Sequence, residues 1–260
     1  MATTVGIVNQ KGGVGKTTTC VNLAGVLVSQ GFRVLVLDFD PQGSASPNLG
    51  ATTTGEALRD ALFELRRLSD QVLATPSGID LIPGGPALSD FLEANRRAKE
   101  KSLLKALGTL PSDLWDFILV DAPPRDDSLS WNVLVASDAV LVPVEAKFQS
   151  LAPLVRVFDA IEELRRDFGR PAVTAGILPT RVTRTRMSRD VIAALRSRFG
   201  DLVFEHHIRE STQIAEAPGG KEVITTHSPH SLGAADYRAA TAELLHRLGV
   251  ERQRERAANE

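Results

Sequence analysis

A glycine-rich run near the start of the chain constrains the fold more than any other feature. The segment Lys11–Thr18 reads Lys-Gly-Gly-Val-Gly-Lys-Thr-Thr, follows the apolar stretch Val5–Val8 and opens a segment with helical character. In a strand–loop–helix unit of this kind, successive backbone N–H groups turn toward an anion, and the helix points its positive end at the charge. Lys16 is predicted to reach the β- and γ-phosphates of a nucleotide, and Thr17 to offer its hydroxyl to Mg²⁺. The residues predicted to hold the phosphates are Gly12, Gly13, Val14, Gly15, Lys16, Thr17 and Thr18.

The loop departs from the general phosphate-binding pattern at its first positions. That pattern places Gly at position 10, whereas this chain has Gln10 followed by a second lysine, Lys11. An early lysine is the mark of the deviant Walker A loops, so the chain resembles the ParA/MinD ATPases. The resemblance implies ATP and Mg²⁺ as cofactors and a homodimer that forms on ATP binding. In that dimer Lys11 is expected to contact the phosphates of the ATP bound to the partner subunit.

Short apolar runs alternate with longer amphipathic segments along the chain. Strands are predicted at Val5–Val8, Val34–Leu37, Ile79–Ile82, Phe117–Val120, Ala139–Val142 and Val173–Leu178. Strands that are apolar on both faces belong inside a parallel sheet covered by helices. The expected fold is therefore α/β, a doubly wound and mostly parallel sheet with helices on both faces, as in P-loop NTPases. Residues 1–250 are expected to form one ATPase domain, and 251–260, charged and without an apolar stripe, a flexible tail.

Two further predictions concern segments between the strands. Residues Ser44–Thr54 are rich in Ser, Thr, Gly and Ala and predict a loop, which a helix over Glu56–Leu68 follows. Apolar residues at helical spacing predict a helix over Gly233–Leu248 that packs on the domain.

Two carboxylates follow the second predicted strand, in Asp38-Phe39-Asp40-Pro41-Gln42. One could hold a water of Mg²⁺ and the other orient an attacking water, although an isolated Asp-x-Asp also fits a turn. The segment resembles the family's D-x-D-P-Q motif. By that resemblance Asp40 is the catalytic carboxylate, beside Lys11 and Lys16, and Asp38 is its supporting partner near the metal.

A third motif is the apolar run Phe117–Val120, which ends in Asp121 and continues as Ala-Pro-Pro. This pattern indicates a Walker B strand whose Asp121 holds a water of the Mg²⁺ shell opposite Thr17. Where relatives have a small residue after Pro-Pro, this chain has Arg125, which fits either a solvated turn or a special role. Recognition of the adenine base is assigned by resemblance to Thr180 and Arg209.

Arginine is concentrated between positions 181 and 198, in a chain with a formal net charge of −2. This pattern fits a solvated helix surface or a stripe that binds phosphates. ParA proteins bind nonspecific double-stranded DNA as ATP dimers through this part of the fold, and a ParB-like centromere-binding protein stimulates hydrolysis. The residues that the resemblance assigns to DNA are Arg181, Arg184, Arg186 and Arg189.

Composition limits the remaining classes. The single cysteine, Cys20, is expected to be a small buried hydrophobe, and one cysteine cannot supply the cluster of the iron–sulfur relatives. No stretch approaches the roughly 20 apolar residues of a membrane span, so a cytoplasmic protein is expected. The resemblance to ParA proteins implies association with the nucleoid, and the lack of an apolar stripe in 251–260 predicts no membrane partner. Two alternatives stay open: a MinD-like ATPase that positions cargo on a membrane surface or protein assembly, and a small-molecule ligase or kinase on the same scaffold.

Overall fold

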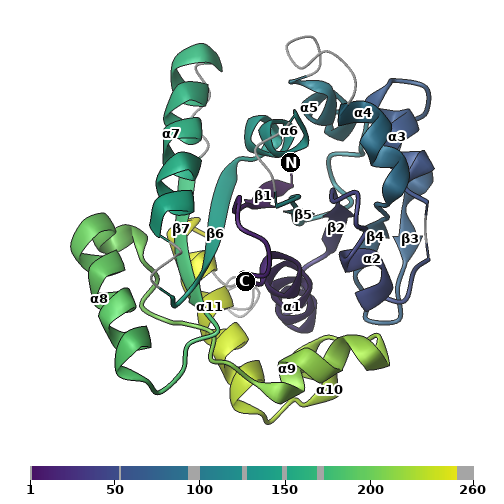
Figure 1. Cartoon of the computed structure of the whole chain (residues 1–260). Coiled ribbons are helices and arrows are strands. Elements are labelled where there is room, and N and C mark those ends of the chain that lie inside the picture. The colour runs from purple at the N-terminus through teal and green to yellow at the C-terminus, as the bar shows by residue number, and fades with distance from the viewer. Residues whose placement is uncertain are drawn as a thin grey trace, which may run out of the picture.

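A seven-stranded sheet runs through the centre of the molecule in the order β3-β4-β2-β5-β1-β6-β7 (Figure 1). Its strands pair in parallel, except that β3 lies antiparallel to β4 at one edge. The computed structural model describes residues 2–52, 54–92, 100–124, 128–147, 151–168 and 173–250. The predicted α/β fold is confirmed. The short strand β3 was not predicted, because two residues are too few to show a strand pattern in the sequence.

The strands are β1 (Thr3–Ile7), β2 (Val34–Asp38), β3 (Leu73–Ala74), β4 (Asp80–Ile82), β5 (Phe117–Asp121), β6 (Ala139–Glu145) and β7 (Val173–Thr180). The helices are α1 (Lys16–Ser29), α2 (Ala45–Asn48), α3 (Glu56–Leu62), α4 (Ser89–Leu92), α5 (Ser102–Leu107), α6 (Ser128–Ala136), α7 (Leu151–Phe168), α8 (Arg186–Phe199), α9 (Thr212–Glu216), α10 (Ile224–His227) and α11 (Leu232–Arg247). Short 3-10 turns are η1 (Leu68–Gln71), η2 (Pro86–Leu88), η5 (Gly200–Leu202) and η6 (Ala217–Gly220).

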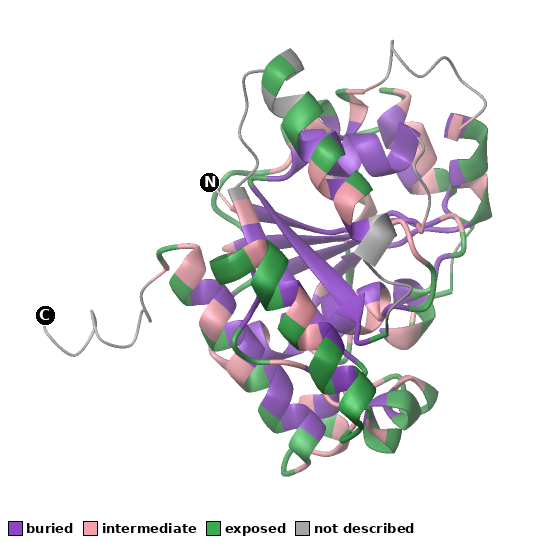
Figure 2. Ribbon diagram, turned by 60° about the vertical axis from the view of Figure 1, so that its left-hand side comes forward, coloured by how far each residue is buried: buried purple, intermediate pink, exposed green. Residues whose placement is uncertain are grey.

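Two apolar layers cover the two faces of the sheet, because alternate residues of each strand point to opposite sides. In β2, Leu35 and Leu37 pack in the layer that contains residues of α3, α5, α6, α7 and α8. Val34 and Val36 pack instead in the layer that contains residues of α1, α10 and α11. Figure 2 shows the strands as a buried slab between helices whose outer faces are exposed. Both faces are therefore closed to water, as the apolar runs predict.

Close contact between the sheet and α6 depends on one glycine in the central strand. A Cβ atom added at Gly6 would lie 2.5 Å from Ser137 Oγ and 2.9 Å from Val133 Cγ1. Glycine at this position therefore lets α6 pack directly on β1, the strand that precedes the loop.

The segment after β2 differs from the sequence prediction in two places. The predicted loop 44–54 contains the short helix α2, and the helix predicted over Glu56–Leu68 ends at Leu62. Glu64 adopts a left-handed backbone with φ of 61°, which a continuing α-helix cannot accommodate. Only the first half of that helix prediction is therefore right. The predicted C-terminal helix is confirmed as α11.

The carboxyl ends of six parallel strands lie along one edge of the sheet. The register pairs Ile7 with Asp121, Asp38 with Asp121, and Glu145 with Thr180. β1 lies between β5 and β6, so the loops that follow it and its neighbours leave in different directions. Ligands of doubly wound sheets bind at such a switch point, and every predicted site residue before position 181 lies at this edge.

Candidate nucleotide site

The loop between β1 and α1 has the backbone of a phosphate cradle. Gly13 and Gly15 have φ values of 75° and 89°, which glycine adopts without strain. Gly15 forms the N-cap of α1 without a side-chain cap, so the first N–H groups of the helix remain available to an anion. Thr180 Oγ1 donates a hydrogen bond of 2.8 Å to Val14 O, which ties the loop to the end of β7.

Lys16 points into the site rather than into solvent. Its side chain is buried, and its Nζ donates to Lys11 O at 3.3 Å. Burial lowers the pKa of the Lys16 ammonium, although the carboxylates of Asp121 and Asp40 oppose this shift. An anionic phosphate beside the ammonium would supply the counter-charge that favours its protonated form.

Two buried carboxylates end neighbouring strands below the loop. Asp38 ends β2 and Asp121 ends β5, and the two residues are direct partners in the sheet register. Desolvation raises the pKa of Asp38 to about 6, although the backbone N–H and the hydroxyl of Ser46 donate to its Oδ2 at 2.8 and 2.6 Å. Desolvation and the nearby charge of Asp38 raise the pKa of Asp121 well above its ordinary value, against the effects of Thr17 and Lys16. A cation at this point would relieve both costs.

The carboxylates fit a hydrated magnesium ion better than a protein-only metal cage. Within the ranges that the structure describes, no group of three or more His, Cys, Asp or Glu side chains is arranged to hold a metal by itself. Neither carboxylate oxygen of Asp121 has a hydrogen-bond partner of ordinary geometry, although both are buried. Mg²⁺ keeps several waters and binds through one or two carboxylates plus phosphate oxygens. The donor set at Asp38, Asp121 and Thr17 therefore suits Mg²⁺ that arrives with a nucleotide.

Asp40 lies in a turn, which is one of the two alternatives that its sequence motif left open. Its carboxylate accepts a hydrogen bond of 2.9 Å from the N–H of Gln42, which makes a turn. Asp40 also lines the cavity beside Lys16 and Thr17. Being part of a turn fixes its position at the phosphate end, where it can hold a water.

A cavity of about 710 Å³ extends from the loop toward the C-terminal part of the chain. At its phosphate end the lining residues are Gly12, Gly13, Gly15, Lys16, Thr17, Thr18, Asp40, Gln42, Ser44 and Pro124. The other lining residues are Thr180, Arg181, Ile208, Arg209, Glu210, Ser211, Thr212, Ile214, Ala215, Pro218 and Tyr237. Of these, Thr180 and Arg181 border the loop, because they donate hydrogen bonds to Val14 O and Gly13 O. The volume is in the range of small-molecule and cofactor sites.

The two residues predicted to recognise adenine both line the cavity, and their polar groups are engaged within the chain. The Arg209 guanidinium donates to both carboxylate oxygens of Asp236 on α11, at distances down to 2.6 Å. The Thr180 hydroxyl donates to Val14 O in the loop. Asp236, which the sequence analysis did not single out, holds Arg209 in place.

A carboxylate that the sequence analysis missed organises the mouth of the loop. Glu145 ends β6, and its Oε2 lies 3.5 Å from Lys11 Nζ. Its Oε1 lies 2.6 Å from Lys147 Nζ and 3.8 Å from Arg181 Nη1. Burial opposes ionisation of Glu145, but these three cations together keep its pKa below the ordinary value. An acidic residue at the end of an apolar strand was the same signal that identified Asp38 and Asp121.

The four arginines predicted to bind DNA fall into two places. Arg181 lies at the loop, where its Nη1 is 3.4 Å from Gly13 O and its Nη2 is 3.4 Å from Glu210. Arg184, Arg186 and Arg189 are exposed on and just before the first turn of α8. The structure therefore brings only the last three together, and it separates Arg181 from them.

The start of α8 is an unusual place for arginine. Thr185 caps this helix by accepting a hydrogen bond from the Ser188 N–H. The positive end of a helix dipole favours acidic residues in the first turn, yet this turn has none. Arg186 is 89% exposed, and its ion pair with Asp190 spans 3.6 Å. The cations there do little for the helix itself and leave their charge to solvent or to an external anion.

Some sequence predictions lie outside the described residues. These are the role of Arg125 and the tail 251–260. Cys20 is fully buried, as predicted. Over the described ranges, no helix combines the length and apolar character that a membrane span needs.

Comparison with known proteins agrees with this geometry. Residues 2–172 match the family model described as AAA domain. The chromosome-partitioning ATPase Soj of Thermus thermophilus is 36% identical over 247 residues, which is 94% of this chain and 96% of Soj. Both matches include the loop and the carboxylates at the ends of β2 and β5.

Two solved structures share the fold along almost the whole chain. The ATP complex of an McdA variant from Cyanothece has a TM-score of 0.84 and 26% identity, covering 96% of this chain and 97% of McdA. Cobyrinic acid a,c-diamide synthase from Mycobacterium smegmatis, with a bound ATP analogue and magnesium, has a TM-score of 0.81 and 27% identity, covering 96% of each chain. Together with the match to Soj and the loop with its two lysines, these likenesses establish that the chain belongs to the ParA/Soj-type family of P-loop ATPases.

Proposed function

We propose that this chain is a nucleotide-controlled DNA partition ATPase. It binds ATP with Mg²⁺, forms a dimer across the nucleotide face, binds double-stranded DNA without sequence preference in that state, and leaves DNA after hydrolysis. The observation that carries the proposal is that the side chains of the two lysines of the loop lie in different places. Lys16 lines the cavity, whereas the side chain of Lys11 turns to Glu145 at the mouth.

The cavity supports ATP and Mg²⁺ as the cofactors. Lys16, Thr18 and the loop N–H groups hold the phosphates, and Thr17, Asp38 and Asp121 serve Mg²⁺ and its waters. Structural neighbours of this chain have been crystallised with an ATP analogue or ADP and with magnesium, which agrees with this assignment. When bound, Mg²⁺ neutralises charge on the phosphates. Asp40 orients the water that attacks the γ-phosphate, and Thr180 and Arg209 shape the end that receives the base.

A dimer gives Lys11 its function. Its side chain is 24% exposed and lies at the mouth of the cavity rather than on the cavity wall, so a phosphate of a second subunit can approach it from solvent. A lysine there would add positive charge to the partner's phosphates in the transition state. The relatives named as partition ATPases support a partner protein that stimulates this step, a ParB-like centromere-binding protein.

DNA is the proposed ligand of the exposed arginines at α8. Arg184, Arg186 and Arg189 form a small basic surface, and a dimer would place two copies of it on one assembly. Two weak half-sites that act together bind much more tightly than either alone. Dimerisation can therefore control DNA binding without any large movement of the arginines.

The proposal is tested by duplex DNA binding at one fixed salt concentration with ATP, ADP and no nucleotide. Binding is expected with ATP alone and is expected to be lost in Lys11→Ala. The matched control is Lys105→Ala, which removes an exposed lysine that pairs with Glu64 away from the site. Binding that is equal in all three nucleotide states would refute nucleotide control.

A second candidate follows from the likeness to cobyrinic acid a,c-diamide synthase, namely ATP-dependent amide formation on a small carboxylic acid. It predicts ATP consumption only with an added carboxylic acid and a nitrogen donor, and no DNA binding in any state. Phosphate release measured with DNA alone, and with a panel of carboxylic acids and an ammonia donor, separates the two.

A further inference from the structure

Glu145 holds Lys11 inside its own subunit. The two charged atoms lie 3.5 Å apart, and the Glu145 side chain is only 8% exposed. The residues are 134 positions apart in the sequence and meet because β1 and β6 are neighbours in the sheet. The pair therefore sits at the mouth of the nucleotide loop, on a rigid strand end.

The backbone beneath Lys11 is fixed independently of this ion pair. The Lys11 N–H donates to Asn9 Oδ1 at 2.9 Å, and Asn9 Nδ2 donates to Pro143 O at 2.8 Å. These bonds join the start of the loop to β6 through neutral groups. A change at Glu145 would therefore remove this restraint on the Lys11 side chain while the backbone bonds of the loop remain.

The two carboxylate oxygens of Glu145 contact different cations. Oε2 faces Lys11, whereas Oε1 contacts Lys147 at 2.6 Å and Arg181 at 3.8 Å. A buried carboxylate that loses its only cation is strongly destabilising. Here two cations remain when Lys11 leaves, so the release of Lys11 leaves no unpaired buried charge behind.

We propose that Glu145 is a positioning residue that restrains Lys11 in the nucleotide-free subunit and releases it to the partner's nucleotide, with Lys147 and Arg181 compensating the carboxylate afterwards. This inference rests on the proposed function, because it assumes that Lys11 acts across a dimer. It adds a threshold: the dimer forms only when the partner's phosphates compete successfully with Glu145 for Lys11.

The test is dimer formation by the full chain with Mg²⁺ and a non-hydrolysable ATP analogue, followed by sedimentation equilibrium. Breaking one partly exposed ion pair changes an equilibrium by about threefold, and a dimer breaks two, which changes its formation constant by about tenfold. Because each dimer holds two analogue molecules, Glu145→Gln is expected to need about threefold less analogue for half-dimerisation. Raising the salt concentration should shrink this gain, because salt already weakens the pair in the wild type.

A double-mutant cycle shows whether the effect passes through Lys11. In a Lys11→Ala background Glu145→Gln should bring no gain, since the restraint is already absent. An equal gain in both backgrounds would overturn the proposal. The charge control is Glu64→Gln, which removes one exposed carboxylate paired with Lys105 and should leave the midpoint unchanged.

Lys147→Met gives a change of opposite sign and keeps the proposal testable if Glu145→Gln folds poorly. Without Lys147 the carboxylate depends more on Lys11, so more analogue should be needed, and Lys11→Ala should abolish this difference as well. If wild-type protein stays monomeric with the analogue bound, the proposed function fails and the restraint fails with it. If the wild type dimerises but the Glu145 and Lys147 variants match it, only the restraint is wrong.

Discussion

Asp38 illustrates how single residues at this site are kept at a cost to the fold. Its carboxylate is fully buried, ends a central strand and lies opposite Asp121 in the sheet. Desolvation raises the pKa of both acids, and the charge of Asp38 raises that of Asp121 further. Such a pair gains nothing from ionising in the nucleotide-free protein, which is the behaviour expected of a site prepared for a cation.

Asp38→Asn is therefore expected to stabilise the nucleotide-free protein at pH 7.5 by about 3 kcal/mol, since a pKa near 6 lies about two units above that of an unfolded aspartate. A raised acid pKa contributes stability at low pH, and this contribution is lost as pH rises from about 4 through about 6. Asparagine keeps an oxygen that can accept from Ser46 and carries no charge, so the gain should vanish near pH 4.

Thermal unfolding of the wild type and Asp38→Asn at pH 4 and pH 7.5 measures this difference. A variant that is less stable than the wild type at pH 7.5 would show that the carboxylate contributes favourably to the fold. Added Mg²⁺ and nucleotide should stabilise the wild type more than the variant, because asparagine lacks the negative charge that is proposed to serve the metal.

Residues that are placed by their position just after a strand could be predicted from the sequence. Residues whose contacts join distant parts of the chain could not. Lys16, Asp38 and Asp121 each follow an apolar strand closely, so the strand pattern alone places them at the edge of the sheet. Glu145 and Arg181 obey the same pattern at the ends of β6 and β7. Their role depends on Lys11, which meets Glu145 only because the sheet brings β1 beside β6. Arg181 was grouped with the arginines of α8 because it is near them in sequence.

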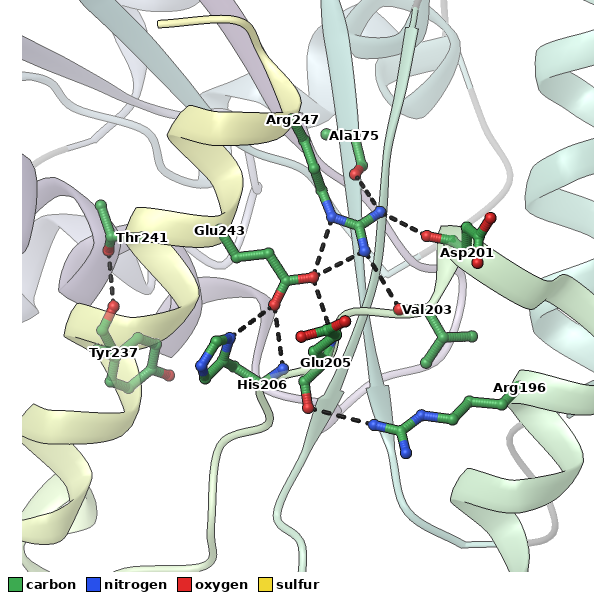
Figure 3. A network of polar contacts seen from close by, with 10 residues as sticks. All are labelled: Ala175, Arg196, Asp201, Val203, Glu205, His206, Tyr237, Thr241, Glu243 and Arg247. Atoms are coloured by element: carbon green, nitrogen blue, oxygen red, sulfur yellow. Dashed lines mark hydrogen bonds and ion pairs between the residues drawn. The ribbon is translucent and has the colours of Figure 1, made fainter. Parts of the chain in front are cut away.

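At the scale of elements, one arginine joins the last helix to the end of the sheet. Arg247 on α11 donates to the carbonyl oxygens of Asp201 at 2.8 Å and Val203 at 3.2 Å, and to Glu243 at 2.7 Å (Figure 3). Its guanidinium also lies 4.4 Å from the ring centre of Phe204. Glu243 in turn accepts from the N–H groups that follow η5, so α11, η5 and β7 share one network. Arg247 also donates to Ala175 O at 3.4 Å, so the network supports the beginning of β7.

Arg247→Met is expected to lower the free energy of unfolding by about 3 kcal/mol, because it leaves a mostly buried Glu243 and several carbonyl groups without a donor. Arg238→Met is the matched control on the same helix, since Arg238 is exposed and donates a hydrogen bond to Pro229 O. Urea unfolding of both variants gives the comparison. Equal effects of about 0.5 kcal/mol or less would mean that the network adds little to stability.

Some secondary-structure elements could be predicted from sequence patterns, and others could not. The strands and α11 follow from apolar periodicity, whereas α3 ends early because Glu64 turns into the left-handed region. The residue type does not predict that turn, because glutamate is an ordinary helix former. The antiparallel edge strand β3 has two exposed residues and pairs only through its backbone with β4.

At the scale of the whole molecule, charge is unevenly placed in a chain that is nearly neutral. The net charge of −2 conceals the basic surface of Arg184, Arg186 and Arg189, which are exposed at the start of α8. Figure 1 shows α8 at the side of the molecule. Phosphate contacts of such arginines release counterions and carry no sequence information. Binding through them should therefore be strong only at modest salt and similar on all duplexes.

Reversing the charge of Arg186 and Arg189 to glutamate should weaken ATP-dependent DNA binding by the same factor on unrelated sequences. The dependence of the logarithm of affinity on the logarithm of salt should become shallower by about 0.9 for each phosphate that an arginine no longer neutralises. Arg66→Glu is the control, because Arg66 is also exposed but pairs with Asp60 beside α3. An unchanged salt slope would place the DNA surface elsewhere.

The central position of β1 has a consequence for how the chain is made. β1 pairs with β5 and β6, so this strand has its neighbours far along the chain, at residues 117–121 and 139–141. More than 100 further residues must be synthesised before β1 can enter the sheet, and the nascent chain carries an unpaired apolar strand until then. Long-range parallel pairing of this kind folds slowly and favours aggregation meanwhile. Production of this protein should therefore depend on chaperones and on the speed of translation more than its native stability alone would suggest.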